Sequence, residues 1–387
     1  EDLEVKYLNA EILIKEGRIH EAVAYLLGVW SHLEEDGADF LYDAAGIFMD
    51  YNLWDYSMMW VHRLERLFPA YPKIKRMKAE LMVCMGRYEK AIPLLNEMLD
   101  EDPYNKEVWN LLAESQGASE QFADAVDSAE YVLAIDKDNQ RALVTKASCL
   151  FHMNQAHEAH VLYQKFLEGH PTDTNVLYLD AVCLASVEQY EASLQLILRA
   201  LNTCEKDSPQ YVHILLEKAY VESKLHRADE AVQSIAQAEA MQMEEVDCEY
   251  GLLKGQVLLE NGRDDEAVKC FVEALRVSAD KRNTLWLIAI AHGDTEHYTE
   301  AAEMVLAILN TFPEDDDSPS PIPYLAYYYY MLNDAPSCLT YLKQSVQTDR
   351  QTTEQLFSSI YPGVTPDEYY LYVYRHFYGC FPEFADE

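Results

Sequence analysis

The feature that most constrains this chain is an internal repeat. Small residues recur along its 387 residues at spacings between 34 and 38, and a second small residue follows each of them after 12 residues. The first set is Ala10, Ala45, Ala79, Ala113, Ala147, Ala181, Ala219, Gly255, Ala289 and Ala326. The second set is Ala22, Ser57, Ala91, Ala125, Ala159, Ser193, Ala231, Ala267, Ala301 and Cys338. Such a regular period indicates an array of small units and not two or three separate globules.

Each unit has the pattern of a helical hairpin. Apolar residues around the first small residue follow helical spacing, as in Leu252, Gly255 and Leu258, and the second small residue opens another such stretch. Small side chains at both points let two antiparallel helices approach closely. Seven residues after the first small residue we expect a turn, because Gly or Asn often stands there and both tolerate the left-handed conformation that ends a helix. These turn positions are Gly17, Asn52, Gly86, Glu120, Asn154, Glu188, His226, Gly262, Glu296 and Asn333.

These patterns resemble the tetratricopeptide repeat family. The residues that match its opening, its second helix and its closing proline are Trp109, Leu112, Ala113, Ala159, Tyr163, Ala267, Phe271, Ala274, Pro69, Pro103, Pro171 and Pro313. Gln116, Glu222 and His292 depart from it, since they replace a large residue late in the first helix. The resemblance covers roughly residues 3–351. It implies an all-α fold, a right-handed α-solenoid of about ten helical hairpins, and the Tyr-rich tail is expected to add an aromatic C-terminal capping helix.

The repeat pattern predicts four segments. Residues 3–312 hold nine repeats, 313–323 form an acidic, Pro-rich linker, 324–351 form a tenth repeat, and 352–387 form a Tyr-rich cap helix and tail. Thr365, Pro366 and Glu368 mark the start of the tail helix, as N-cap, first helical residue and capping-box partner. We expect that helix to end near Gly379. An aromatic patch for a partner, or a segment that folds into the protein's own groove, are the alternatives to a cap.

Charge and composition exclude several classes of function. Thirty Lys and Arg stand against 67 Asp and Glu, a formal net charge of −37, which argues against nucleic-acid partners and against docking on anionic membranes. No apolar run approaches 18 residues, so we expect no membrane insertion. The eight cysteines include no C-x-x-C pair, which favours free thiols, a reducing compartment and a cytoplasmic location. The chain begins at Glu1 without an apolar leader, and we interpret it as processed or trimmed, which is compatible with a removed signal.

The sequence contains little that points to chemistry. No nucleotide-binding, metalloprotease or nucleophile-elbow motif occurs, so we expect no cofactor, no metal and no catalytic site. His152, His157 and His160, and the pair His292 and His297, are interpreted as surface residues. Cys149 and Cys183 hold equivalent positions in adjacent repeats, whose helices pack about 8–10 Å apart, farther than a disulfide allows. We interpret both as small core residues.

The resemblance places function in a concave groove lined by the first helices. Residues three before and one after the first small residue would point into it, and they turn from polar and acidic to apolar and aromatic along the chain. The candidate ligand-binding residues are Val144, Tyr178, Val182, Leu216, Tyr220, Leu252, Trp286, Ile290 and Tyr327. An apolar strip suits a helix or an extended peptide, although tighter packing within the superhelix is the alternative. Asn110 lies between Glu80 and Glu114, so we expect no clamp for acidic peptide tails.

Three functions follow from this pattern. The first is a non-catalytic interaction scaffold that binds an apolar or basic protein segment in the groove. The second is a regulatory or targeting arm of an enzyme whose catalytic part lies on another segment. The third is a chaperone-like factor that masks an apolar helix of a client. The oligomeric state stays open.

Overall fold

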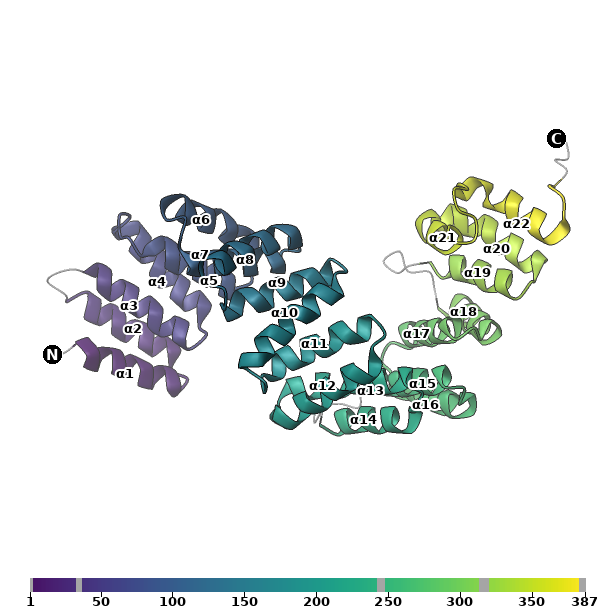
Figure 1. Cartoon of the computed structure of the whole chain (residues 1–387), viewed down its shortest axis with the longest axis horizontal. Helices are drawn as coiled ribbons and strands as arrows, with labels where there is room; N and C mark the ends of the chain where they lie inside the picture. Colours follow the sequence, from purple (N-terminus) through teal and green to yellow (C-terminus); the bar gives the residue numbers. More distant parts are fainter. Residues whose placement is uncertain (1–2, 33–36, 242–247, 313–319, 383–387) are drawn as a thin grey trace. The chain divides into compact units, whose positions relative to one another are not determined.

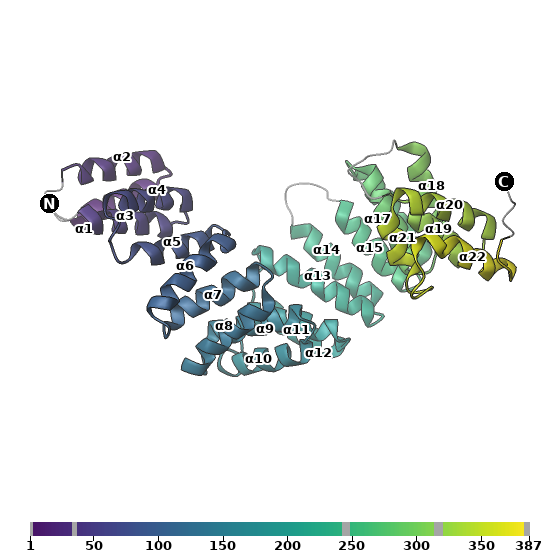
Figure 2. The ribbon, with the colours of Figure 1, turned by 90° about the horizontal axis from the view of Figure 1, so that it is seen from above.

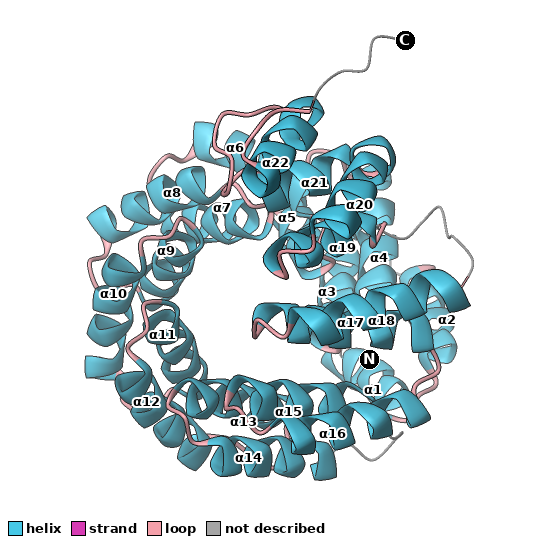
Figure 3. Cartoon of the chain, turned by 90° about the vertical axis from the view of Figure 1, so that its right-hand side faces the viewer, coloured by secondary structure: helices cyan, strands magenta, loops and turns pink. Residues whose placement is uncertain are grey.

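The computed structural model describes residues 3–32, 37–241, 248–312 and 320–382. Over these ranges all regular structure is helical, as Figure 3 shows. The predicted linker at 313–323 lies mostly outside the described residues, and its last two positions belong to the helix that begins at Ile322. None of the described helices is both long enough and apolar enough to cross a membrane.

The helices form two compact units that divide after Gln189. The first unit contains α1 (Leu3–Lys15), α2 (Ile19–Trp30), α3 (Gly37–Asp50), α4 (Trp54–Leu67), α5 (Ile74–Cys84), α6 (Tyr88–Glu101), α7 (Lys106–Ala118), α8 (Phe122–Ile135), α9 (Gln140–His152), α10 (Ala156–Gly169) and α11 (Thr174–Ser186). Pairs from α1/α2 to α9/α10 are antiparallel hairpins, and each second helix also packs against the next hairpin (Figure 1).

The second unit contains α12 (Tyr190–Thr203), α13 (Pro209–Lys224), α14 (Ala228–Met241), α15 (Cys248–Glu260), α16 (Asp264–Val277), α17 (Lys281–Asp294), α18 (Tyr298–Thr311), α19 (Ile322–Met331), α20 (Ala335–Thr348), α21 (Arg350–Phe357), the short 3₁₀ helix η1 (Pro366–Glu368) and α22 (Tyr369–Tyr378). Helices α13/α14, α15/α16, α17/α18 and α19/α20 form its hairpins. Figure 2 shows α13 beside α14 and α19 beside α20. The prediction of an all-α solenoid of stacked hairpins is confirmed.

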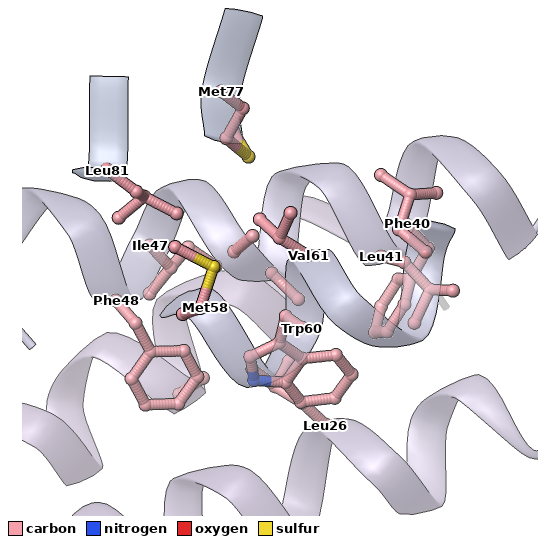
Figure 4. Packing of buried hydrophobic residues seen from close by; sticks show 14 of the residues in the cluster. Leu26, Phe40, Leu41, Ile47, Phe48, Met58, Trp60, Val61, Met77 and Leu81 are labelled. Atoms are coloured by element: carbon pink, nitrogen blue, oxygen red, sulfur yellow. The ribbon is translucent and has the colours of Figure 1, made fainter. Parts of the chain in front are cut away.

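The small residues occupy the places that the repeat pattern predicts. All twenty are buried. The core around them is filled by large side chains from neighbouring helices, and Figure 4 shows part of it in the first unit. There Trp60 is fully buried, its ring stacks on Phe48 with centroids 6.4 Å apart, and Leu26 and Leu41 pack in the same cluster. Because each hairpin is too thin to bury its own apolar faces, this core depends on stacking.

The turn position has a left-handed backbone conformation in all ten repeats, whatever residue holds it. All ten predicted residues have φ between 57° and 76°, including Glu120, Glu188, His226 and Glu296. At Gly86 the N–H of Arg87 donates to the carbonyl of Met82 (2.8 Å) and that of Gly86 to the carbonyl of Val83 (3.0 Å). These two bonds satisfy carbonyls that the end of the helix would otherwise leave unpaired. The geometry of the hairpin therefore fixes this backbone conformation, and glycine is convenient there but not required.

Two of these turns offer a stability prediction. We expect Glu120→Gly and Glu188→Gly each to raise the free energy of unfolding by about 0.5–1 kcal/mol, because the left-handed region is costly for an L-residue. Gly86→Ala, at the equivalent turn, is the matched control and should lower it by a similar amount. Thermal unfolding followed by circular dichroism measures both. A glutamate-to-glycine variant that melts at a lower temperature than the wild type would contradict the expectation.

The polar departures from the family pattern are buried, and two of them carry their own partners. Gln116 Oε1 accepts a hydrogen bond from Ser128 Oγ at 2.7 Å. Glu222 accepts one from Ser234 Oγ at 2.8 Å and forms an ion pair with Lys218 at 2.9 Å. In both hairpins the serine stands 12 residues after the polar residue, on the facing helix. A serine at this point satisfies a side chain that burial would otherwise leave unpaired.

The C-terminal tail contains one more helix than predicted. Asp349 caps α21 by accepting a hydrogen bond from the Thr352 N–H at 3.0 Å, directly after α20, with no glycine or asparagine to mark the junction. The predicted helix at Thr365 begins as η1 and continues as α22, and Gly379 follows it with φ 72°. The Glu368 carboxylate accepts from the Thr365 N–H (3.2 Å) and hydroxyl (2.7 Å). The tail packs against α20 and α21; its role as a cap stays a prediction.

Candidate functional site

The predicted groove residues all lie on first helices, at half-buried or exposed positions. Eight of the nine are half-buried and Tyr220 is 45% exposed. Three of them, Tyr220 on α13, Leu252 on α15 and Ile290 on α17, line hollows in the second unit. The other six do not line these hollows: Trp286, for example, packs edge-on against Tyr324 with ring centroids 4.9 Å apart. The remaining five are Val144, Tyr178, Val182, Leu216 and Tyr327.

An apolar hollow of about 290 Å³ lies between α15, α16 and α17. Its lining residues are Glu249, Leu252, Leu253, Gln256, Phe271, Leu287, Ile290, Ala291 and Asp294. Leu253 is 38% exposed and Leu287 is 44% exposed, so both apolar side chains face water. Sequence reasoning missed these two leucines. The available signal was their shared position, two residues before the small residue, which lies on the same helical face as the position one residue after it.

A second, larger hollow of about 730 Å³ lies beside the first. It is lined by Tyr220, Ser223, Lys224, His226, Gln256, Leu259, Glu260, Gly262, Asp294, Thr295 and Glu296. Lys224, Glu260 and Asp294 are the last residues of α13, α15 and α17, so this cavity lies where three first helices end. Gln256 and Asp294 line both hollows, which makes the two hollows neighbours.

The charges of the larger cavity are mostly negative. Lys224 Nζ donates to Glu260 Oε2 at 3.2 Å and lies 5.5 Å from the centre of the Tyr220 ring. Ser223 Oγ also donates to Glu260, at 2.9 Å. Burial raises the pKa of the Asp294 carboxyl, the Glu260 charge raises it further, and the Lys224 charge opposes them. Asp294 therefore lies in a negative electrostatic environment, and its own carboxylate adds to that negative charge.

The polar half of the predicted groove is internally paired. Arg141 forms two hydrogen bonds to Glu114, at 2.7 and 2.9 Å, and Arg76 donates to Glu80 at 2.7 Å. Asn110 is only 2% exposed, and neither atom of its amide has a hydrogen-bond partner among the described residues. The acids that flank Asn110 in the sequence are thus neutralised by arginines, a pairing that the repeat positions alone did not predict.

One of the predicted surface histidines, His292, is buried, and two others, His160 and His297, are half-buried. His292 is 4% exposed, its Nδ1 has no partner among the described residues, and burial lowers its pKa. It occupies the interior position that a large residue usually holds, so the surface interpretation was wrong. His160 is half-buried, and its Nδ1 lies 2.6 Å from Oδ1 of the fully buried Asp180. His152 and His157 are exposed, and the described residues contain no cluster of three possible metal ligands.

The cysteines behave as the sequence predicts. Cys149 and Cys183 are buried, and neither forms a disulfide. Burial raises the pKa of each thiol to about 11, so both stay protonated and unreactive near neutral pH. Their interpretation as small core residues is confirmed.

Comparison with known families adds to this geometry. A family model for the tetratricopeptide repeat matches residues 72–115, which include all of α5 and α6 and most of α7. This match and the stacked hairpins support a tetratricopeptide repeat array in this chain. A second model, described as anaphase-promoting complex, cyclosome, subunit 3, matches residues 118–200 of the repeat array.

The individual relatives of this chain are distant. The chain is 22% identical over 208 residues to the mouse (Mus musculus) protein N-alpha-acetyltransferase 16, NatA auxiliary subunit, a match that covers 53% of this chain and 24% of that relative. A solved tetratricopeptide repeat protein from Parabacteroides merdae ATCC 43184 has a TM-score of 0.43 and 15% identity, over 72% of this chain and 94% of that one. YrrB, described as a TPR protein with an unusual peptide-binding site, has a TM-score of 0.41 and 14% identity, over 49% and 95%. At TM-scores this low, the likeness carries no conclusion about the ligand of this chain.

Proposed function

We propose that this protein is a non-catalytic interaction scaffold, which holds a segment of a partner protein against the first helices α13, α15 and α17. The observation that carries the proposal is the exposure of Leu253 and Leu287 on the wall of a shaped hollow. Apolar side chains that face water in a concave site favour the binding of another apolar surface. Leu252 and Ile290, two of the predicted groove residues, line the same hollow and support the proposal.

The size of the hollow indicates what could fill it. Its volume of about 290 Å³ exceeds the roughly 150 Å³ of a buried apolar cavity that holds a benzene molecule. One large aliphatic or aromatic side chain of a partner would fit there and remove the two leucines from water. Burial of a leucine side chain is worth about 1.5–3 kcal/mol when it is complete, and partial burial is worth less. The site would therefore act as an anchor within a longer contact.

A second candidate is the same scaffold used as the supporting subunit of an enzyme. The observation that favours it is the partial match to a protein described as a NatA auxiliary subunit. The two candidates differ only in the identity of the partner, since in both of them this chain supplies a binding surface and no catalytic group.

We expect Leu253→Ser/Leu287→Ser to weaken partner binding at least tenfold, since about 1.4 kcal/mol of lost apolar contact corresponds to that factor. The control is Leu198→Ser on α12, because Leu198 is 44% exposed in the same unit but lines neither hollow. A photo-reactive amino acid at position 287 should cross-link the partner in cells, whereas one at position 198 should not. The captured protein is then purified, and its affinity is measured for all three chains by calorimetry.

The measured affinities decide whether this face binds the partner, and the identity of the partner decides between the two candidates. Equal affinities for the double variant and the wild type, with both well folded by circular dichroism, would remove the site from this face. If the cross-linked partner is the catalytic subunit of an enzyme, the second candidate holds.

A further inference from the structure

The larger cavity lies at a place where the backbone itself attracts cations. The C-terminal end of a helix carries a partial negative charge from its aligned peptide dipoles, and α13, α15 and α17 all end at this cavity. Each end also presents a charged side chain, namely Lys224, Glu260 and Asp294. One of these three charges is positive, so the lysine offsets only part of the negative potential.

The carboxylates of the cavity differ in whether another side chain pairs with them. Glu260 is engaged by Lys224 and Ser223, as described above. Neither Asp294 nor Glu296 forms an ion pair with any described residue. Both are exposed at the rim, where a ligand can reach them. The negative charge of the cavity that no ion pair engages therefore lies on these two residues.

The cavity also offers groups that suit a cationic side chain in particular. The ring of Tyr220 is 45% exposed and already has one cation, Lys224, over its face. A guanidinium or ammonium group near such a face is attracted to the ring as well as to carboxylates. Because the described residues hold no cluster of metal ligands, an organic cation fits this site better than a metal ion.

The geometry points to a two-part ligand, and this inference rests on the proposed function. We propose that the partner segment inserts an apolar side chain into the hollow beside Leu253 and Leu287, and a neighbouring lysine or arginine into the cavity beside Asp294 and Glu296. The two hollows share Gln256 and Asp294, so both side chains belong to one short stretch of chain. In an extended segment, residues two positions apart point the same way about 7 Å apart, which suits this arrangement.

The raised pKa of Asp294 agrees with this assignment. The carboxyl is destabilised in its charged form by partial burial and by the charge of Glu260. A cation bound beside it would relieve that effect, whereas an anionic ligand would increase it. The negative cavity thus discriminates between basic and acidic partner segments.

A random heptapeptide display library, selected on the full chain, tests the inference. The wild type is expected to enrich peptides in which an Arg or Lys stands one or two positions away from an apolar residue. The best arginine peptide is then synthesised beside a variant with citrulline, which has the same shape but no charge. We expect the arginine peptide to bind about fivefold to tenfold more weakly to Asp294→Asn/Glu296→Gln than to the wild type, and the citrulline peptide to bind both alike.

Controls separate this inference from the proposed function. Because a chain with 37 net negative charges attracts basic peptides non-specifically, Glu230→Gln/Asp265→Asn removes two exposed carboxylates from α14 and α16 and should leave binding unchanged. An equal loss in this control would overturn the inference. Selected peptides that need Leu253 and Leu287 but are indifferent to Asp294 and Glu296 would overturn it too, while the proposed function stands. Peptides that bind Leu253→Ser/Leu287→Ser as well as the wild type would contradict both.

Discussion

Gly255→Ala is expected to lower the free energy of unfolding of the second unit by about 1–3 kcal/mol, although alanine is the residue found at this position in the other hairpins. The reason is the aromatic side chain that packs on this glycine. A Cβ added to Gly255 would overlap Cε1 of Phe271 and lie 2.6 Å from its Cδ1, and Phe271 is itself buried. The ring cannot move away without disturbing the core between α15 and α16. Thermal and urea unfolding, followed by circular dichroism, would measure the change.

The same contact predicts a rescue. Phe271→Leu removes the ring atoms that the new methyl group would meet, so Gly255→Ala/Phe271→Leu should melt at a higher temperature than Gly255→Ala alone. Such non-additivity is the signature of two side chains in direct contact. Gly28→Ala on α2 is the control, because nothing lies within 4 Å of its added Cβ, and it should stabilise the helix by about 0.5–1 kcal/mol. A Gly255→Ala chain as stable as the wild type would show that the ring is not held in place.

Tyr369→Ala should have the largest effect in the tail, with a loss of about 3–5 kcal/mol at this end of the chain. Tyr369 is fully buried and packs with Phe357, Leu342 and Val373, and its ring centroid lies 5.7 Å from that of Phe357. Its removal should undock α22 and expose the outer face of α20. Hydrogen exchange would then accelerate in α20 to α22 but not in α13 to α16, because stability in a repeat array is largely a nearest-neighbour property.

Tyr369→Phe is the matched variant, and we expect it to raise the free energy of unfolding, whereas Tyr369→Ala lowers it. The Tyr369 hydroxyl is buried without a hydrogen-bond partner among the described residues. Removal of an unsatisfied buried polar group should raise the free energy of unfolding by about 1 kcal/mol, while the aromatic packing stays. If Tyr369→Phe were as damaging as Tyr369→Ala, the hydroxyl and not the ring would hold the tail. Unchanged exchange in Tyr369→Ala would mean that α22 contributes nothing to the last hairpin.

The sequence predicts best those features that every hairpin needs. The twenty small residues and the ten left-handed turns recur because each hairpin has the same close helix contact and the same chain reversal. Even Glu120 and Glu188, poor residues for such a turn, could be placed correctly from their register alone.

Features that depend on one local contact could not be predicted in this way. The burial of His292 and the exposure of Leu253 and Leu287 follow from which neighbours surround them, and a repeat alignment does not contain that information. Helix α21 was missed because Asp349 starts it directly after α20, without a glycine or asparagine spacer. The hollows, likewise, depend on the side chains of three successive hairpins and have no signature within one repeat.

The buried polar pairs bear on how an array of near-identical units finds its correct partners during folding. A second helix can in principle dock on the wrong first helix, since most hairpins present the same alanines and leucines. The serine partners of Gln116 and Glu222, Ser128 and Ser234, stand on the facing second helix, so docking of a wrong second helix costs free energy at these two hairpins. A mispaired Glu222 would keep its ion pair with Lys218 but lose its serine hydrogen bond, at a cost of about 1–3 kcal/mol. These two hairpins would therefore disfavour mispaired helices while the chain folds. The remaining repeats could then stack on two correctly paired hairpins.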